Sequence, residues 1–349
     1  MKGKFGIELT NNLLTYDFTI TRNITIIQGD SGTGKTTLIN MLESLVDDDG
    51  SVQCKITNSI PGIDIQLEVI NERERYWEEV IRSAKNKILF FDEKCEFIKT
   101  KEFAAAVKGS DCYFVIITRA KLSMLPYSVE EIYRIEEDKR YPKLKKVHNT
   151  LVKRYDTNSV RMVPDLILTE DSNSGYEFVS TSFSKFKCIS CEGKNNVSKV
   201  IAENKNADNI LAIVDGAAFG PDMEDVSTVI RERSFLGKQT MLYAPESFEW
   251  IILRSELFYT QYKEQLDATY NYVDSAEHES WERYYTSLLI EITKNTLQAY
   301  KKSGLNRYYL VGKANASIKK MYNVIEEGNA AQSSSRKIET FHGFDNLSK

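Results

Sequence analysis

The sequence contains no long apolar run and no apolar segment at its start. None of its runs reaches the roughly 18 apolar residues of a membrane-spanning helix, and the opening Met1-Lys2-Gly3-Lys4-Phe5 lacks the apolar core of a signal peptide. These absences exclude a membrane-embedded class and predict a soluble, cytoplasmic protein. The length of 349 residues predicts two domains, and an apolar fraction of 42% is enough for substantial cores.

Cysteine is scarce, and its spacing provides neither a disulfide framework nor a metal site. The five cysteines are Cys54, Cys95, Cys112, Cys188 and Cys191. An odd number without a regular pattern fits a reducing compartment. Cys188 and Cys191 form a single C-x-x-C in an apolar strand-like run, with no second pair and no histidine nearby. Buried thiols are therefore favoured over zinc or redox chemistry.

The chain also lacks an excess of positive charge. Its formal net charge of -4 argues against nonspecific binding of nucleic acid over the whole surface, but not against a local basic groove. Basic residues do gather, with tyrosines between them, from Asp138 to Tyr155. This segment could bind a phosphate backbone, but a solvated linker or helix face is the favoured interpretation.

What the chain does contain is a complete phosphate-loop motif, G-x-x-x-x-G-K-[ST]. Its residues are Gly29, Asp30, Ser31, Gly32, Thr33, Gly34, Lys35 and Thr36. A strand-like run, Ile24–Ile27, precedes the motif and a helix-like stretch begins at Thr37, which is the context that the motif requires. The glycines let successive backbone N–H groups point at phosphate oxygens beside the positive end of a helix, where Thr37 also lies. Lys35 would reach the β- and γ-phosphates of ATP, and the Thr36 hydroxyl would bind Mg²⁺.

Two carboxylates follow a second apolar strand-like run, Lys87–Phe91. Asp92 is predicted to hold Mg²⁺, directly or through water. Glu93 stands where a catalytic base could orient the attacking water, and this second carboxylate indicates hydrolysis rather than transfer by a kinase.

Strand-like and helix-like runs alternate through residues 1–137 and again through residues 186–243, which predicts parallel sheets with right-handed crossovers. From about residue 248 to residue 326 the pattern is mostly helical, with the longest helix expected at Trp281–Lys302. We therefore expect an α/β fold with an ATPase domain over 1–137, a basic linker over 138–180, a second α/β domain over 181–250, a helical region over 251–327 and a flexible tail over 328–349.

The first half resembles P-loop ATPases with an additional catalytic glutamate, the group that includes ABC-type, RecF-like and AAA ATPases. The resemblance covers about residues 1–137 and rests on the phosphate-loop motif, Asp92 and Glu93. It implies ATP and Mg²⁺ as cofactors, assembly into a homo-oligomer, and a sensor of the γ-phosphate at the end of the next strand. Thr118 is favoured as that sensor and Arg119 would serve a neighbouring subunit, with ordinary strand-end polarity as the alternative for both.

One feature of the ABC side of this group is missing. No LSGGQ-like signature lies between the phosphate loop and Asp92, and only 55 residues (37–91) separate the two motifs. Dimerisation across two nucleotides is therefore not expected, and a minimal ATPase that works as a switch or assembly module fits better.

The second half resembles, over about residues 186–250, the TOPRIM domain of topoisomerases, primases and OLD-family nucleases, including versions paired with ATPases in anti-phage systems. The likeness rests on a strand that ends in Glu192 and Gly193 and a later strand that ends in Asp215. It implies a Mg²⁺ or Mn²⁺ site in which Asp215 is a metal ligand and Glu192 is a ligand or the general acid–base. The second aspartate of the family is absent, because Ala217 stands in its place.

Three interpretations of the second half stay open: an active nuclease, a degenerate TOPRIM-like fold, and an unrelated α/β domain in which Glu192 and Asp215 cap helices. Carboxylates that could complete a metal site are Asp222, Glu224, Asp225, Glu246 and Glu249. Convergence of Glu192, Asp215 and one of these would favour the nuclease, and divergence would favour a binding module.

The sequence as a whole predicts an enzyme in which ATP binding and hydrolysis regulate metal-dependent cleavage of DNA or RNA, as in anti-phage defence. The alternative is an ATPase switch whose second half binds a partner protein and does not cleave. The basic segment and Glu192 favour the first, whereas Ala217 and the acidic net charge favour the second. A nucleotide kinase is least favoured, because Glu93 would have no role in it.

Overall fold

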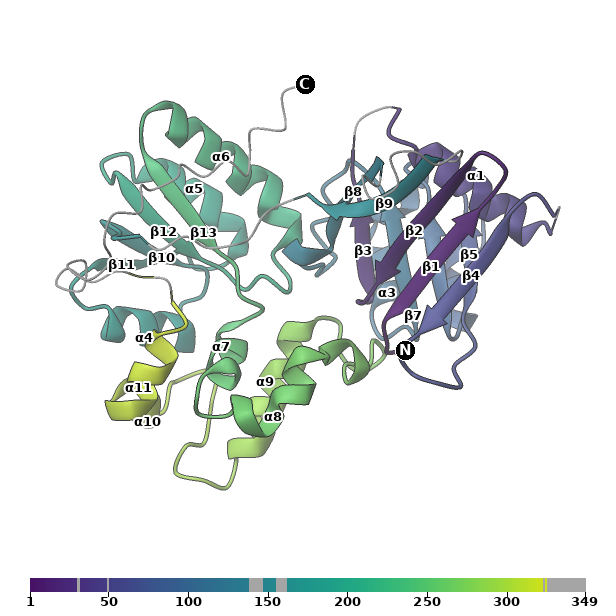
Figure 1. Cartoon of the computed structure of the whole chain (residues 1–349). Coiled ribbons are helices and arrows are strands. Elements are labelled where there is room, and N and C mark those ends of the chain that lie inside the picture. Colours follow the sequence, from purple (N-terminus) through teal and green to yellow (C-terminus); the bar gives the residue numbers. More distant parts are fainter. Residues whose placement is uncertain (30–31, 49, 138–146, 155–161, 323, 325–349) are drawn as a thin grey trace. The chain divides into compact units, whose positions relative to one another are not determined.

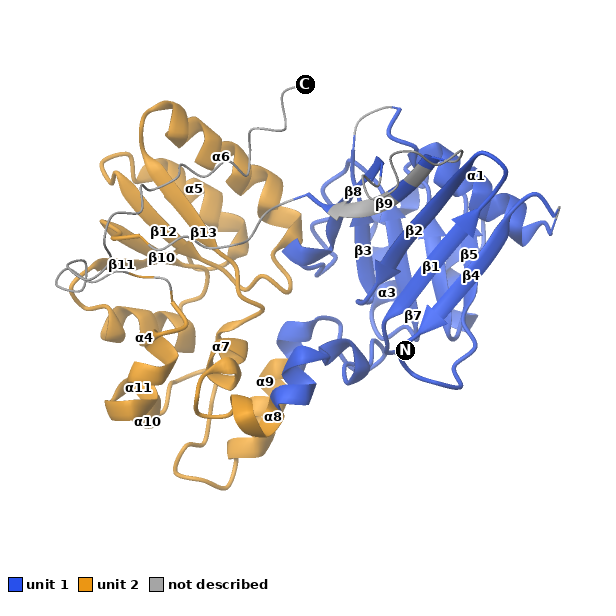
Figure 2. Ribbon diagram, viewed as in Figure 1, with its two compact units in different colours: residues 1–154, 263–284 blue, residues 155–262, 285–349 orange. Residues whose placement is uncertain are grey.

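The computed structural model describes residues 1–29, 32–48, 50–137, 147–154, 162–322 and 324, and its fold is α/β (Figure 1). The chain divides into two compact units (Figure 2). The first comprises residues 1–154 and 263–284, and the second comprises residues 155–262 and 285–349. No helix within the described residues is both long and apolar enough to cross a membrane.

A nine-stranded mixed sheet forms the first unit, with the strand order β4-β1-β2-β9-β8-β3-β7-β6-β5. The strands are β1 (Phe5–Thr10), β2 (Leu14–Ile20), β3 (Ile24–Ile27), β4 (Gln53–Asn58), β5 (Gln66–Ile70), β6 (Lys87–Phe91), β7 (Cys112–Ile117), β8 (Ile132–Glu137) and β9 (Val147–Lys153). The helices before β9 are α1 (Lys35–Val46), α2 (Trp77–Ser83) and α3 (Lys101–Val107), with short 3-10 turns at Glu96–Lys99 and Val129–Glu131. Strands β8, β3, β7, β6 and β5 are parallel, which confirms the expectation drawn from the alternation of strands and helices.

This sheet curls strongly on itself. Phe5 of β1 and Tyr113 of β7 lie five strands apart in the sheet order, which corresponds to about 24 Å in a flat sheet. Their rings nevertheless meet edge to face with centroids 5.4 Å apart. The two ends of the sheet therefore face each other, and the core between them encloses the apolar side of α1, including Leu38, Met41 and Leu42.

A four-stranded parallel sheet forms the second unit, with the strand order β11-β10-β12-β13. The strands are β10 (Leu166–Thr169), β11 (Lys187–Ser190), β12 (Asn209–Ile213) and β13 (Gln239–Tyr243). The helices are α4 (Ser174–Ser182), α5 (Val197–Glu203), α6 (Met223–Phe235), α7 (Phe248–Arg254), α10 (Arg307–Leu310) and α11 (Gly312–Lys319), while α8 (Tyr259–Asp267) and α9 (Trp281–Thr293) continue across the boundaries between the units. Helices α5 and α6 pack together on one face of this sheet and α4 lies on the other (Figure 1).

The segment expected to be a linker, 138–180, contains two strands and most of a helix that belong to the folded units. Strand β9 pairs with β2 and β8 in the first sheet, and β10 and α4 belong to the second unit. Strand β10 has four residues, all buried, and so short an apolar run carries no readable period. Residues 138–146 of the basic segment and the predicted tail, 328–349, lie outside the described residues.

The long helix expected at Trp281–Lys302 is shorter in the structure, since α9 ends at Thr293. The Thr293 hydroxyl donates to the carbonyl of Leu289 and accepts from the amide of Tyr300, at 2.7 and 3.0 Å. A threonine side chain that bonds backbone groups on both sides competes with helical hydrogen bonding, and here it anchors the chain that leaves the helix.

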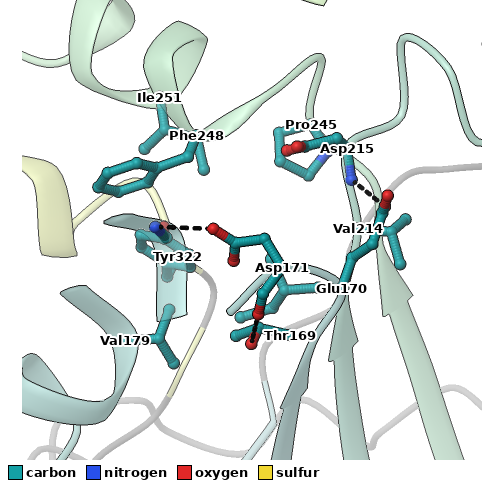
Figure 3. A pocket seen from close by; sticks show the side chains of 12 residues that line it. Thr169, Glu170, Asp171, Val179, Val214, Asp215, Pro245, Phe248, Ile251 and Tyr322 are labelled. Carbon is teal, nitrogen blue, oxygen red and sulfur yellow. Dashed lines mark hydrogen bonds between the residues drawn. The ribbon is translucent and has the colours of Figure 1, made fainter. Parts of the chain in front are cut away.

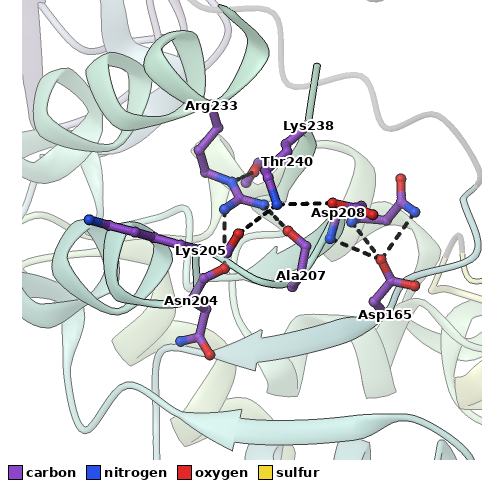
Figure 4. Close-up of polar contacts among 9 residues, drawn as sticks. Asp165, Asn204, Lys205, Ala207, Asp208, Arg233, Lys238 and Thr240 are labelled. Carbon is purple, nitrogen blue, oxygen red and sulfur yellow. Dashed lines mark hydrogen bonds and ion pairs between the residues drawn. The ribbon is translucent and has the colours of Figure 1, made fainter. Parts of the chain in front are cut away.

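A buried arginine connects three segments at the amino-terminal edge of the second sheet (Figure 4). Arg233 of α6 is 5% exposed. Its Nε donates to Thr240 Oγ1 at 2.7 Å, and its two terminal nitrogens donate to the carbonyls of Asn204 and Ala207 at 3.2 and 2.8 Å. Because these carbonyls end α5 and precede β12, the guanidinium fixes the approach of both elements to the sheet.

Replacing Arg233 by methionine should lower the free energy of unfolding by about 2 kcal/mol, because three partly buried acceptors lose their donor. Urea denaturation of the full chain measures this. Arg231→Met is the matched control, since Arg231 lies exposed on the same helix, and its effect should stay within about 0.5 kcal/mol. Equal effects of the two substitutions would contradict the assigned role of Arg233.

Candidate functional site

The phosphate-loop motif lies between the buried strand β3 and the start of α1. Gly34 is the residue before the helix, with a φ of 89°, and Gly32 has a φ of 82°. Both angles lie in the left-handed region, where glycine is favoured because it has no Cβ. Asp30 and Ser31, predicted to bind nucleotide, lie outside the described residues, so their part in the loop stays a prediction.

The Lys35 side chain points back into the loop and is only 7% exposed. Its ammonium donates to the Gly29 carbonyl at 2.7 Å and to Thr33 Oγ1 at 3.1 Å. The first backbone N–H groups of α1, including those of the exposed Thr36 and Thr37, have no acceptor within the helix. An anion in the loop would therefore meet both a buried cation and the positive end of a helix.

The strand order places the other predicted residues at the same edge of the sheet. Strands β3, β7 and β6 are adjacent and parallel, so their carboxyl ends lie together. Thr118 follows β7, and its amide donates to the carbonyl of Ile27 at the end of β3, at 3.1 Å. Its buried hydroxyl accepts from the amide of Ala120 at 3.0 Å. Because β7 lies between β6 and β3, Asp92 is separated from the loop strand by two strand spacings, about 10 Å, which leaves room for a phosphate group and its metal.

Asp92 and Glu93 differ in their surroundings. Asp92 is half-buried, and its Oδ1 accepts from the amide of Glu93 at 2.8 Å. Glu93 is exposed, and its Oε2 lies 3.8 Å from Arg119 Nε. Both partners of this pair are exposed, so it contributes little to stability, but it brings Arg119 beside the predicted base. The Asp92 carboxylate and the Thr36 hydroxyl are hard oxygen donors, which suits Mg²⁺.

The second unit also gathers polar residues at a carboxyl edge (Figure 3). The chain runs from β10 to β11 on one side and then crosses to β12 on the other, and such a reversal is where α/β sheets bind ligands. Glu170 and Asp171 follow β10, and Asp215 lies two residues after β12. Together they line a pocket with about 20 Å³ of room for water, which is enough for at least one molecule. The Asp215 amide donates to Glu170 Oε2 at 2.9 Å.

Two carboxylates of this unit, Asp171 and Glu249, already accept hydrogen bonds from the protein. Asp171 accepts from three backbone amides of the following turn, at 3.0 to 3.2 Å, and so caps the start of α4. Burial raises the pKa of Asp171, while these amides oppose the shift. Glu249 is 1% exposed and accepts from the Tyr300 hydroxyl at 2.8 Å, with Lys302 Nζ 4.0 Å away.

Glu192, predicted to act together with Asp215, is not placed beside it. Glu192 follows the edge strand β11, and β10 lies between that strand and β12. It is exposed, with a φ of 57°. The residue beside Asp215 is Glu170, whose carboxylate accepts from the Asp215 amide. The sequence analysis did not predict Glu170. A signal was present, because Glu170 and Asp171 form an acidic pair after an apolar strand, as Asp92 and Glu93 do. Ala217, at the position of the missing aspartate, is 2% exposed.

No group of three or more His, Cys, Asp or Glu within the described part of the chain is arranged to hold a metal ion. The cysteines behave as thiols: Cys188 and Cys191 are unpaired, and burial raises their pKa values to about 11 and about 12. Of the carboxylates that line the pocket, Asp171 already accepts hydrogen bonds from three backbone amides, so a divalent cation bound there would compete with these contacts at the start of α4.

Comparison with known proteins adds no family assignment. No protein-family model matches the chain, and no curated protein sequence matches it. The roles considered below therefore rest on the residues themselves and on their arrangement at the two sheet edges.

Substituting alanine at Gly34 should lower the free energy of unfolding of the nucleotide-free protein by about 3 kcal/mol, because strain from the positive φ adds to a collision. A Cβ at Gly34 would lie 2.7 Å from the hydroxyl of Tyr16, whereas a Cβ at Gly32 would meet nothing within 4 Å. Gly32→Ala is thus the control, with an expected cost of about 1 kcal/mol from φ alone. Thermal and urea unfolding both measure the loss of stability in each variant. Equal losses at Gly34 and Gly32 would contradict the close packing of Tyr16 against Gly34.

Proposed function

We propose that the first unit binds and hydrolyses ATP. The observation that carries the proposal is the buried Lys35 ammonium, held inside the glycine-containing loop at the sheet edge where Asp92 and Glu93 also lie. This combination suits a P-loop ATPase. Backbone amides and a cation would hold the phosphates, and a carboxylate two strands away would face them.

The residues divide the chemistry between them. Lys35 and the first amides of α1 would bind the β- and γ-phosphates, and Thr36 and Asp92 would hold Mg²⁺, which neutralises phosphate charge when bound. Glu93 would orient the attacking water as general base. Thr118, beside the end of β3, would sense the γ-phosphate, and Arg119 is close enough to Glu93 to influence it.

Two substitutions should separate binding from turnover. Lys35→Ala should abolish measurable ATP binding, because the loop loses its cation, whereas Glu93→Gln should retain binding and lower kcat by about 10² to 10⁴. Phosphate release and calorimetric titration with ATP measure the two quantities. Glu96→Gln is the control, because Glu96 is exposed nearby and pairs with Lys99. ATP hydrolysis by Lys35→Ala at the wild-type rate would refute the proposal.

For the second unit we propose a binding module without cleavage activity, whose partner is a protein and whose state follows that of the ATPase. This account is favoured because Asp171 and Glu249 already accept hydrogen bonds, Ala217 stands where the TOPRIM family has an aspartate, and Glu192 follows the edge strand β11, with β10 between it and β12. The second candidate is an active TOPRIM-like nuclease that cleaves DNA or RNA with a bound metal ion, as in anti-phage defence. The observation in its favour is the hydrogen bond between Glu170 and the Asp215 amide, beside the pocket that both residues line. Assembly into a homo-oligomer stays a prediction from the resemblance.

Incubation of plasmid DNA and of RNA with the full chain, Mg²⁺ or Mn²⁺, and ATP should give no cleavage above background. The matched variants are Glu170→Gln, Asp215→Asn and Glu192→Gln. Cleavage that disappears in the first two and persists in the third would establish the second candidate at the site found in the structure. Cleavage that disappears only in Glu192→Gln would instead support the site predicted from sequence.

A further inference from the structure

Tyr16, a residue of β2 outside the phosphate-loop motif, contacts the last glycine of the loop. Tyr16 lies on β2, is 1% exposed, and packs in the same core as Leu38 of α1 and Ile135 of β8. Its hydroxyl donates to the carbonyl of Gly34 at 2.7 Å. The contact is close, since a Cβ on Gly34 would lie 2.7 Å from the hydroxyl oxygen and 3.8 Å from the ring carbon that bears it.

The Gly34 carbonyl accepts two hydrogen bonds. One comes from the amide of Leu38, at 2.9 Å, and is the first bond of α1. The other comes from Tyr16, and a carbonyl oxygen has two lone pairs with which to accept both. Together the two donors fix the direction of this carbonyl, and with it the plane of the peptide between Gly34 and Lys35.

The orientation of that peptide matters for phosphate binding. A trans peptide is planar, so its N–H points opposite to its C=O. With the Gly34 carbonyl held toward Tyr16 and along α1, the N–H of Lys35 is directed out of the helix start, into the loop. This is the side on which a bound phosphate would lie.

We propose that Tyr16 is a positioning residue of the nucleotide site, which aims the Lys35 amide at the phosphates through its hydrogen bond to the Gly34 carbonyl. This inference rests on the ATP-binding function proposed above and adds to it a residue of β2 that touches no ligand. The role belongs to the hydroxyl group of Tyr16, which makes the hydrogen bond. A phenylalanine would fill nearly the same core volume but could not donate this bond.

The surroundings of Tyr16 keep its hydroxyl in the donor form. Burial raises the pKa of Tyr16, and hydrogen bonds with Asn149 and Thr37 oppose that shift without reversing it. Asn149 is the register partner of Tyr16 on β9, and Thr37 lies in the first turn of α1. The phenol therefore stays protonated near neutral pH and donates to the loop.

The test is Tyr16→Phe in the full chain, with Tyr113→Phe as the matched control. Tyr113 is 2% exposed, lies in the same core, and donates its hydroxyl to the carbonyl of Gly3 at 3.2 Å. Each variant therefore loses one buried hydroxyl bonded to a glycine carbonyl in the same unit, but only Tyr16 contacts the loop. The measurements are the dissociation constant of Mg²⁺-ADP, the KM and kcat of ATP hydrolysis, and the thermal midpoint.

Tyr16→Phe should raise the ADP dissociation constant and the ATP KM about tenfold, the factor that one hydrogen bond of ordinary strength supplies, with kcat changed less than twofold. Tyr113→Phe should leave the ADP dissociation constant, the ATP KM and kcat within twofold of wild type. The thermal midpoints of Tyr16→Phe and Tyr113→Phe should shift by similar amounts. Unchanged nucleotide affinity in Tyr16→Phe, or an equal loss in both variants, would overturn the positioning role. A wild-type chain that binds no nucleotide would instead refute the proposed function.

Discussion

The burial of one ammonium group is the constraint on which the first unit depends. A charged group taken out of water needs oxygen partners, or its burial costs several kcal/mol. Lys35 finds them in the loop that precedes it, at Gly29 and Thr33. The loop can close around its own lysine only because Gly32 and Gly34 adopt positive φ values. The position of the Lys35 ammonium therefore depends on the backbone path that these two glycines allow.

The curled sheet supports this arrangement from a distance. Strands β1 and β2 are far from β3, β7 and β6 in the strand order, yet the curl brings them over the same core and across α1. This places Tyr16 under the start of the helix, where its hydroxyl reaches the Gly34 carbonyl. A glycine-containing loop has much conformational freedom on its own. The hydrogen bond from Tyr16 attaches this one to strand β2 of the sheet.

The two units treat their carboxylates differently. Asp92 and Glu93 stand at a sheet edge with few protein partners among the contacts described, and Glu93 is exposed. In the second unit, the Asp171 carboxylate caps the start of α4, and the buried Glu249 carboxylate accepts a hydrogen bond from the Tyr300 hydroxyl. Carboxylates that already satisfy backbone amides and hydroxyls contribute to the fold, and they are poorly available for a metal ion. The same edge geometry thus leaves Glu93 exposed in the first unit and engages Asp171 and Glu249 in the fold of the second.

The sequence by itself determined what depends on local patterns: the glycine loop, the strands before it and before Asp92, and the α/β character of both units. Only the tertiary structure decided what depends on pairing between distant segments. The motif gave no sign of Tyr16, because β2 meets the loop only through the curl of the sheet. Glu170 was missed for Glu192 because the order of strands in the sheet, not their succession in the chain, selects which carboxylate lies beside Asp215.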